Sequence, residues 1–212
     1  MLDISMLKEA VIKGNAPQTK ELTQQALQEK ISPEIVLKEG LIAAMQEVGD
    51  RFEKGEYFVP EMLISARAMK EGMTILKPSL LKEGIQAIGK VAIGTVKGDL
   101  HDIGKNLVAM MLEGAGFEVI DLGTDVAPEK FTQAVTDRKA NVIGLSALLT
   151  TTMLNMKAVI QALESAGIRN KVKVIIGGAP VTDAFAKEIG ADGFGQDASH
   201  AVRVAKQLLA IS

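Results

Sequence analysis

The sequence predicts an α/β protein in which an N-terminal bundle of four helices precedes a five-stranded parallel sheet. Two observations predict this class. Residues 1–86 show helical periodicity only, whereas from Lys90 onward short β-rich runs alternate with helical stretches. We therefore expect a helical domain over residues 1–86 and an α/β domain over residues 87–212, joined by a linker near residues 80–89.

The helical part should contain four helices with short connections, which favours an antiparallel bundle. Ser32 is a good N-cap for the third helix, with Pro33 at its first position. Residues 49–58 contain glycines and should break the pattern, and Pro78 should end the fourth helix. The expected helices cover residues 7–13, 19–30, 33–48 and 60–77.

The second part repeats strand and helix five times, which is typical of a doubly wound parallel sheet of the Rossmann-like (flavodoxin-like) kind. The predicted strands are residues 91–96, 117–122, 142–145, 172–176 and a weak 193–194. The predicted helices are residues 104–113, 128–139, 151–166, 181–189 and 199–210.

Composition excludes several classes of function. The 212 residues include no cysteine, which excludes disulfides, thiolate metal sites and cysteine nucleophiles and fits a reducing cytoplasm. The net charge is −2, and acidic side chains outnumber basic ones in residues 1–86, so neither nucleic acid nor a membrane surface is an expected partner. No apolar stretch reaches the length of about 18 residues that a membrane span needs. We expect a cytoplasmic protein.

Polar or glycine-rich segments follow three of the predicted strands, at residues 97–104, 146–148 and 177–180. In an open α/β sheet, ligands bind beyond the carboxyl ends of the strands, where these segments should meet. The first segment contains His101, with Asp99 two residues before it. A metal-bound imidazole usually donates its second ring N–H to a carboxylate, and Asp99 could accept it, with Ser146 bonded to that carboxylate. Alternatively, Asp99 and His101 form a solvated turn, and Ser146 satisfies the backbone.

Other sites of α/β sheets fit these residues poorly. The first strand is followed by neither a dinucleotide-binding G-x-G-x-x-G nor a phosphate-binding P-loop. A Ser146–His101–Asp99 hydrolytic triad is conceivable, but no G-x-S-x-G surrounds Ser146. We therefore favour a ligand site that centres on His101.

Three motifs in this part resemble the cobalamin-binding domain of corrinoid proteins and methionine synthase. That family has Asp-x-His-x-x-Gly, a spacer of 41 residues, Ser-x-Leu, a spacer of 26 to 28 and Gly-Gly. Here Asp99 to Gly104 is followed by 41 residues, Ser146 to Leu148 by 28, and then by Gly177-Gly178. Residues 48–62 also resemble the helical cap of methyl-transferring corrinoid proteins, so the resemblance covers nearly the whole chain.

The resemblance implies a cobalamin (corrinoid) cofactor whose own base leaves cobalt, so that His101 becomes the lower metal ligand. Asp99, His101 and Ser146 would form a proton relay and act in the chemistry, and Gly177 and Gly178 would let the backbone approach the nucleotide tail. The implied cofactor contacts in the α/β part are Gly98, Asp99, His101, Asp102, Ile103, Gly104, Ser146, Leu148, Thr150, Gly177 and Gly178. The implied contacts of the helical cap with the upper face are Phe58, Val59, Met62 and Leu63.

The resemblance also implies a function and its partners. We expect a protein that carries a methyl group from a substrate-specific methyltransferase to a second methyltransferase using tetrahydrofolate or coenzyme M, with a reductive activator as a further candidate partner. The protein is then not catalytic alone, because the cofactor carries the chemistry. The alternatives are the small cobalamin subunit of a carbon-skeleton mutase, a cobalamin-sensing regulator, and a storage or trafficking protein. The helical part disfavours the mutase subunit, and its acidic character disfavours a DNA-binding regulator.

Overall fold

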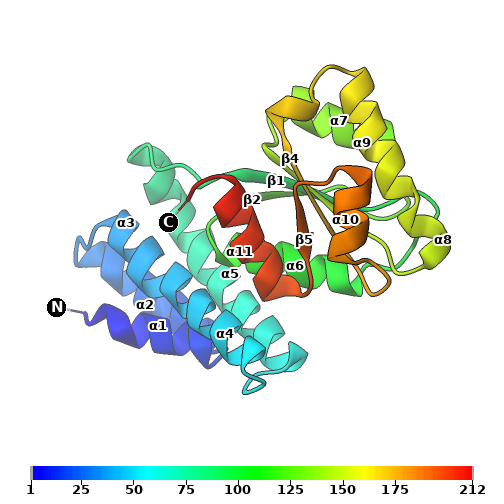
Figure 1. The fold of residues 1–212 in the computed structure, drawn as a ribbon. Helices are drawn as coiled ribbons and strands as arrows, with labels where there is room; N and C mark the ends of the chain where they lie inside the picture. The colour runs from blue at the N-terminus through cyan, green and yellow to red at the C-terminus, as the bar shows by residue number, and fades with distance from the viewer. Residues whose placement is uncertain (1, 212) are drawn as a thin grey trace. The chain divides into compact units, whose positions relative to one another are not determined.

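The computed structural model describes residues 2–211 and divides the chain into two compact units. A helical unit extends to Ala87 and includes Gly114–Gly116, and a sheet unit comprises Ile88–Glu113 and the chain from Phe117. Figure 1 shows the helices and strands of each unit along the chain. Among the described residues, no helix is both long enough and apolar enough to cross a membrane.

The helical unit is the four-helix arrangement that the sequence predicts. Its third helix is one continuous helical run that contains a π-helical segment, η1. Helix α2 packs along α5, and α1 packs against α2, η1 and α4. The elements are α1 (Ile4–Ile12), α2 (Ala16–Gln28), α3 (Pro33–Ile35), η1 (Val36–Ile42), α4 (Ala43–Glu53) and α5 (Val59–Lys82).

Two helix ends in this unit differ from the prediction. Helix α4 continues through Gly49 to Glu53, and the burial of Val48 and Gly49 explains why the glycine is tolerated there. Helix α5 continues through Pro78 to Lys82. Leu76 and Leu80 lie one turn apart and are both buried, so their packing holds the last turn in helical form despite the proline. The linker is correspondingly shorter than predicted.

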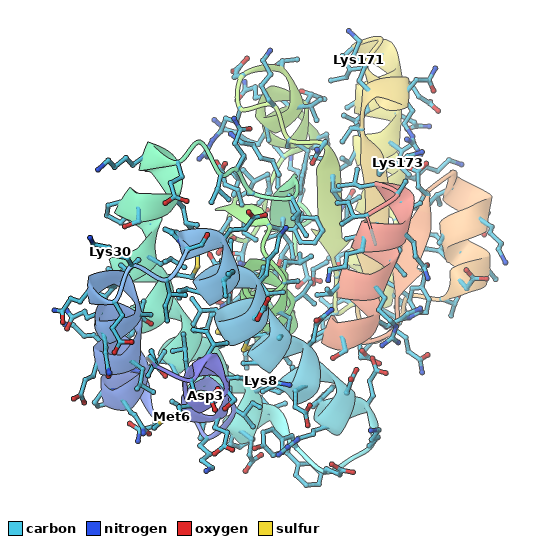
Figure 2. The ribbon with its side chains drawn as sticks, turned by 90° about the vertical axis from the view of Figure 1, so that its left-hand side faces the viewer. Asp3, Met6, Lys8, Lys30, Lys171 and Lys173 are labelled. Carbon is cyan, nitrogen blue, oxygen red and sulfur yellow. The ribbon has the colours of Figure 1, made fainter. Side chains whose placement is uncertain are left out.

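Side chains satisfy the backbone at both ends of α1. The Asp3 carboxylate, labelled in Figure 2, accepts a hydrogen bond from the Ser5 N–H at 2.9 Å and thus caps the N-terminus. At the other end, the Ile12 carbonyl accepts hydrogen bonds from the Ser65 hydroxyl at 2.9 Å and the Tyr57 hydroxyl at 3.2 Å. These long-range bonds fix α1 against α5 and the segment before it.

The sheet unit contains the five parallel strands that the sequence predicts, in the order β2-β1-β3-β4-β5. Each strand pairs in parallel with its neighbours, and the register aligns Thr95, Ser146 and Gly177 at the carboxyl ends of the three central strands. The strands are β1 (Lys90–Thr95), β2 (Glu118–Asp121), β3 (Val142–Ser146), β4 (Lys173–Gly177) and β5 (Gly193–Gly195).

Helices cover both faces of this sheet. Helices α7, α9 and α10 share one buried apolar core with the strands, and Figure 1 shows α6 and α11 on the opposite face. A short 3₁₀ turn, η2, precedes β4; Lys171 within it and Lys173 at the first residue of β4 are labelled in Figure 2 and mark the amino end of that strand. The helices are α6 (Ile103–Gly114), α7 (Pro128–Thr136), α8 (Thr150–Met153), α9 (Asn155–Ser165), α10 (Asp183–Ile189) and α11 (Ala198–Leu208), and η2 is Arg169–Lys171.

One predicted helix is divided in two. The sequence predicts a single helix over residues 151–166, but the structure has the short helix α8 and then α9, with Leu154 between them. Thr152 in α8 and Asn155 at the start of α9 each form a side-chain hydrogen bond to the loop after β1. The interruption between α8 and α9 therefore coincides with two side-chain hydrogen bonds to the loop after β1.

Candidate functional site

The candidate site lies at the carboxyl edge of the sheet, beside the central strand β1. Strand β1 has β2 on one side and β3 on the other, so the chain changes direction across the sheet at this strand. Crevices at such a switch point are where open α/β sheets bind their ligands. The loop that contains His101 follows β1. Ser146 is the last residue of β3, and the second segment of the site follows it.

Asp99 is the buried centre of this site, with no exposed surface. Its Oδ1 accepts a hydrogen bond from the His101 N–H at 3.0 Å and lies 2.7 Å from the His101 Nδ1. Its Oδ2 accepts bonds from the Thr152 hydroxyl at 2.6 Å and the Leu148 N–H at 2.8 Å, with a longer contact to the Leu149 N–H at 3.4 Å. Both carboxylate oxygens are therefore used by donors from two loops.

These donors keep the carboxylate ionised. Burial acts to raise the pKa of Asp99, but the hydrogen bonds from Thr152, from the His101 and Leu148 amides and from the His101 ring outweigh burial. The pKa of Asp99 consequently lies well below its ordinary value. An ionised carboxylate can only accept hydrogen bonds, so the network assigns the proton of a neutral His101 ring to Nδ1.

The other ring nitrogen of His101 is therefore an available metal ligand. About half of the side chain is exposed (51%), and Nε2 has no hydrogen-bond partner among the described residues. A carboxylate that accepts from one ring nitrogen fixes the orientation of the imidazole and raises the basicity of the other nitrogen. Residues 2–211 contain no cluster of three or more His, Cys, Asp or Glu side chains that could hold a free metal ion. One imidazole suits a metal that a macrocycle already holds.

Neighbouring loops hold the His101 loop in place. The Thr95 hydroxyl donates to the His101 carbonyl at 2.9 Å, and the Asn155 amide donates to the Lys97 carbonyl at 2.8 Å. On the other side, the Asp125 N–H donates to the Asp99 carbonyl at 3.0 Å, and the Gly98 N–H donates to the Asp125 carboxylate at 2.7 Å. The φ angle of Gly98 is +83°, a conformation that glycine adopts without strain.

An ion pair between a buried lysine and a half-exposed aspartate ties the start of α6 to the end of β2. The Lys105 ammonium is buried and lies 2.6 and 2.7 Å from the two carboxylate oxygens of Asp121. Burial acts to raise the pKa of Asp121, but Lys105 and the Gly123 N–H outweigh it, so the pKa is lowered. The pair fixes the helix that begins two residues after His101.

Four exposed apolar side chains, here called the apolar rim, belong to the two segments that hold the Asp99–His101 pair. Leu100 and Ile103 flank His101 in sequence and are 73% and 81% exposed, and Leu148 and Leu149 beside Asp99 are each 44% exposed. Large exposed apolar side chains on neighbouring segments are typical of a binding surface. The apolar rim and the single imidazole suit a broad, largely apolar ligand that carries a metal at its centre.

The remaining predicted residues of the α/β part fall into two groups. Asp102 and Thr150 are exposed near the site, and the Asp102 carboxylate accepts a bond from the Asn106 amide at 3.0 Å. Ser146 is at the predicted edge, where its carbonyl accepts from the Val96 N–H at 3.0 Å. Its hydroxyl makes no hydrogen bond to Asp99 in the part of the chain that the structure describes. In this structure the hydroxyl that donates to Asp99 is that of Thr152, six residues after Ser146, and the role of Ser146 in a relay stays a prediction.

The predicted glycines are glycine for different structural reasons. A Cβ at Gly178, where φ is +131°, would lie 1.8 Å from the Ala147 carbonyl oxygen, and one at Gly177 would lie 2.9 Å from the Gly195 carbonyl oxygen. The fold itself therefore requires both. A Cβ at Gly104 would meet no atom of the described residues within 4 Å. Glycine in a helix is unfavourable relative to alanine, and packing within the described chain does not require it at Gly104, which leaves room for close approach of a ligand.

The residues predicted to cover the upper face of the cofactor are at the beginning of α5. Phe58, Val59 and Leu63 are 64%, 38% and 40% exposed, as contact residues require. Met62 is fully buried and cannot present a surface.

Sequence reasoning missed the residues that hold the His101 loop. Thr152, Asp125, Asn155 and Lys105 come from four different segments, and each contributes a bond or ion pair described above. Three consecutive threonines at residues 150–152, shortly after the end of β3, were the one visible signal for a hydroxyl donor. Nothing in the sequence spacing distinguished Thr152 from Thr150 and Thr151.

Family models identify the class of protein to which this fold and site belong. Two models described as B12 binding domain match residues 4–77 and 89–203, so the match covers both units and the second model alone covers more than half of the chain. The chain therefore belongs to the B12-binding family, and it binds a cobalamin-type cofactor. The residues of the site fit that group, because the segments that hold an oriented imidazole with an available Nε2 also expose large apolar side chains.

More specifically, the chain is a corrinoid protein of the kind found with methylamine and methanol methyltransferases. It is 42% identical over 208 residues to the trimethylamine corrinoid protein of Methanosarcina barkeri, covering 97% of this chain and 96% of that one. A cobalamin-binding protein from Desulfitobacterium hafniense has a similar structure, with a TM-score of 0.81 and 32% identity over 98% of both chains. A chain of the methanol:cobalamin methyltransferase complex MtaBC of Methanosarcina barkeri has a TM-score of 0.87 and 31% identity, covering 99% of this chain and 80% of that one.

Proposed function

We propose that this protein carries a methyl group on a corrinoid that is bound with its own base displaced and with His101 Nε2 as the lower cobalt ligand. The observation that carries the proposal is the buried Asp99 carboxylate 2.7 Å from His101 Nδ1, which leaves Nε2 oriented and without a partner in residues 2–211. A bound cobalamin would supply a cobalt centre that takes up and gives away a methyl group. The chain supplies the ligand, its orientation and its surroundings.

The surrounding residues would hold the cofactor on either side of His101. Leu100, Ile103, Leu148 and Leu149 would contact the apolar parts of the macrocycle, and Gly104 would allow its close approach. Ser146, at the end of β3, together with the exposed Gly98, Asp102 and Thr150, would offer polar contacts. Phe58, Val59 and Leu63 of the helical unit are the proposed contacts to the upper face.

We propose two methyltransferases as partners, one specific for the methyl donor and one that delivers the methyl group to tetrahydrofolate or coenzyme M, with a reductive activator as a third partner. The similarity to a trimethylamine corrinoid protein and to a chain of a methanol methyltransferase complex supports this assignment. The relatives differ in the methyl donor that their names give, so we assign the choice of donor to the partner.

The axial ligand can be tested with the visible spectrum of the purified protein reconstituted with methylcobalamin and with hydroxocobalamin. The variant His101→Ala removes the proposed ligand, and His200→Ala is the matched control, because His200 is the only other histidine in the sequence. His200 lies in α11, where its Nδ1 accepts a bond from the Gln196 N–H at 3.3 Å.

We expect wild type and His200→Ala to retain the cofactor with the same ligand-dependent spectrum. His101→Ala should lose that spectrum and bind cofactor more weakly. If the spectrum of bound cofactor is the same in all three proteins, His101 is not the axial ligand and the proposed binding mode is wrong. If wild type binds neither cobalamin, the whole proposal fails.

A further inference from the structure

The loop that contains His101 begins with a tight turn whose central peptide joins Lys97 to Gly98. The Asp99 N–H donates to the Val96 carbonyl at 3.1 Å, which closes a four-residue turn. The φ angle of Gly98 is +83°, whereas that of Lys97 is not positive, and this combination fits a type II β-turn. The turn ends at Asp99, so its shape sets the direction in which the chain enters the Asp99–His101 pair.

Two side chains from outside the loop hold this central peptide at both ends. A type II turn does not itself bond its central peptide, because its one internal hydrogen bond joins the first and last residues. Here the Lys97 carbonyl accepts a bond from the Asn155 side-chain amide at 2.8 Å, and the Gly98 N–H donates to the Asp125 carboxylate at 2.7 Å. Asp125 follows β2 and Asn155 follows β3, the two strands on either side of β1. One peptide group is therefore held from both sides of the central strand.

The backbone of Asp125 is adapted to this contact. Its φ angle is +53°, a left-handed conformation that aspartate and asparagine adopt more readily than other non-glycine residues. Its N–H donates to the Asp99 carbonyl at 3.0 Å while its carboxylate accepts from Gly98. A residue in such a conformation persists where several contacts fix it. Asp125 thus holds two consecutive residues of the loop, just before His101.

We propose that Asp125 and Asn155 form a peptide clamp, which fixes the orientation of the turn's central peptide and thereby positions His101 for cobalt. Rotation of this one peptide would convert the type II turn into a type I turn, in which Gly98 would have a negative φ angle. Both outside bonds oppose that rotation, because it would direct the N–H and the carbonyl away from their partners. Asp125 and Asn155 are positioning residues, since they act on the ligand through the loop. The inference rests on the proposed role of His101 as the axial ligand.

Removal and rescue variants test each side of the peptide clamp. Asp125→Gly removes the carboxylate without adding backbone strain, because glycine accepts a positive φ angle, whereas Asp125→Asn keeps an oxygen that can accept the bond. Asn155→Ala removes the amide donor. The matched controls are Asp137→Ala and Asn170→Ala, because both side chains are exposed and neither bonds to the His101 loop in the described chain. Each protein is titrated with methylcobalamin, and the visible spectrum at saturation gives the fraction of cobalt that has imidazole bound.

We expect Asp125→Gly and Asn155→Ala each to raise the dissociation constant about 3- to 10-fold, which corresponds to the loss of one hydrogen bond, and to lower the imidazole-bound fraction at saturation. Asp125→Asn should bind within about twofold of wild type, because its bond is kept. The double variant Asp125→Gly/Asn155→Ala should lose less affinity than the product of the two single effects, because both bonds hold the same peptide group. The two controls should keep the affinity and the imidazole-bound spectrum of wild type.

Two results would overturn the inference. One is a pair of folded Asp125→Gly and Asn155→Ala proteins with the affinity and spectrum of wild type. The other is a double variant whose loss equals the product of the single losses, since the two bonds would then act independently. Failure of the underlying proposal is distinguishable, because His101→Ala would then leave the wild-type spectrum unchanged.

Circular dichroism of the cofactor-free proteins shows whether each variant is folded. If Asp125→Gly is not, Asn155→Ala decides the question alone, because it lies at the first residue of α9, where alanine is well tolerated. An Asn155→Ala protein with the affinity and imidazole-bound spectrum of wild type would then contradict the peptide clamp.

Discussion

The two units of this protein bury polar side chains in different ways. In the helical unit, the fully buried Thr19, Thr23 and Ser65 each donate one hydrogen bond to a backbone carbonyl. In the sheet unit, the buried polar groups include two charged side chains, Asp99 and Lys105. The Asp99 carboxylate accepts several bonds, from its own loop and from the segment after β3. In the helical unit, by contrast, each hydroxyl donates to a carbonyl of its own helix or of a neighbouring helix.

This difference indicates which buried polar groups serve the stability of the fold and which serve the site. A buried hydroxyl that donates to a carbonyl is satisfied by that one bond and adds modest stability. A buried charge is costly unless several donors compensate it, and it is rarely the most stable choice for a core. The sheet unit keeps such a charge directly behind its one exposed imidazole. The buried charge therefore marks the site.

The largest effect that we expect follows from Asp99→Asn. The amide side chain has nearly the same shape but places an NH₂ group where an oxygen now accepts hydrogen bonds, and it removes the charge. We expect the cofactor-free sheet unit to lose about 3 kcal/mol of its free energy of unfolding. Thr23→Val, which removes one local hydroxyl bond in α2, should cost the helical unit about 1 kcal/mol.

Urea unfolding followed by two signals measures these losses separately. Tyr57 is the only tyrosine and there is no tryptophan, so tyrosine fluorescence reports on the helical unit, while circular dichroism reports on both units. Asp99→Asn should shift the transition seen by circular dichroism more than Thr23→Val does. Equal shifts for the two variants would contradict the proposed difference between the units.

A smaller effect is expected from the second charged group of the sheet unit. Asp121→Asn removes the partner of the buried Lys105, but about half of the Asp121 side chain is exposed, so water compensates part of the loss. We expect a loss of about 1–2 kcal/mol at pH 7. Lys105→Met should cost less than Asp121→Asn, because it removes the buried charge and leaves an exposed carboxylate.

The pH dependence of this pair has a defined sign. The pKa of Asp121 is lowered in the folded protein, so its contribution is complete above the ordinary value of 3.8 and is lost as the pH falls through the folded value. The stability difference between wild type and Asp121→Asn should therefore shrink as the pH is lowered below about 4. Urea midpoints measured between pH 7 and pH 3 test this, and a difference that grows toward acid pH would contradict it.

The sequence predicted the fold closely because its signals are local or periodic. The five strands, their order of occurrence and the four helices of the first unit follow from apolar periodicity and glycine or proline positions. The continuation of α5 through Pro78 did not follow, because tertiary burial of Leu80 outweighed the local effect of the proline.

The site was only partly predictable for a related reason. Asp99 and His101 lie two residues apart, so their pairing could be predicted from one loop. The hydroxyl behind Asp99 comes from 53 residues further along the chain, and its identity depends on where α8 ends. The family spacing drew attention to Ser146, whereas the hydroxyl that donates to Asp99 in the structure is that of Thr152. Long-range contacts of this kind are set by turn geometry, which the periodicity of a sequence does not report.

The smallest effect concerns two glycines inside helices, one in each unit. A Cβ at Gly72 in α5 would lie 3.0 Å from Leu41 Cδ2 and 3.1 Å from Thr19 Cγ2, two fully buried side chains that would have to shift to make room. A Cβ at Gly104 in α6 would meet nothing within 4 Å in the described chain. Gly104→Ala should thus stabilise the cofactor-free protein by about 0.5 kcal/mol, because alanine favours the helix. Gly72→Ala should give no gain.

The same Gly104→Ala variant should bind methylcobalamin more weakly than wild type, since the added methyl group occupies space that we assign to the cofactor. Gly72→Ala should keep wild-type affinity, provided that its helical unit remains folded by circular dichroism. Opposite signs for stability and affinity at one residue distinguish a position kept for a ligand from one kept for packing. If Gly104→Ala gains stability and binds methylcobalamin as wild type does, the cofactor does not approach the start of α6, and the contacts assigned to Leu100 and Ile103 would need to be tested in turn.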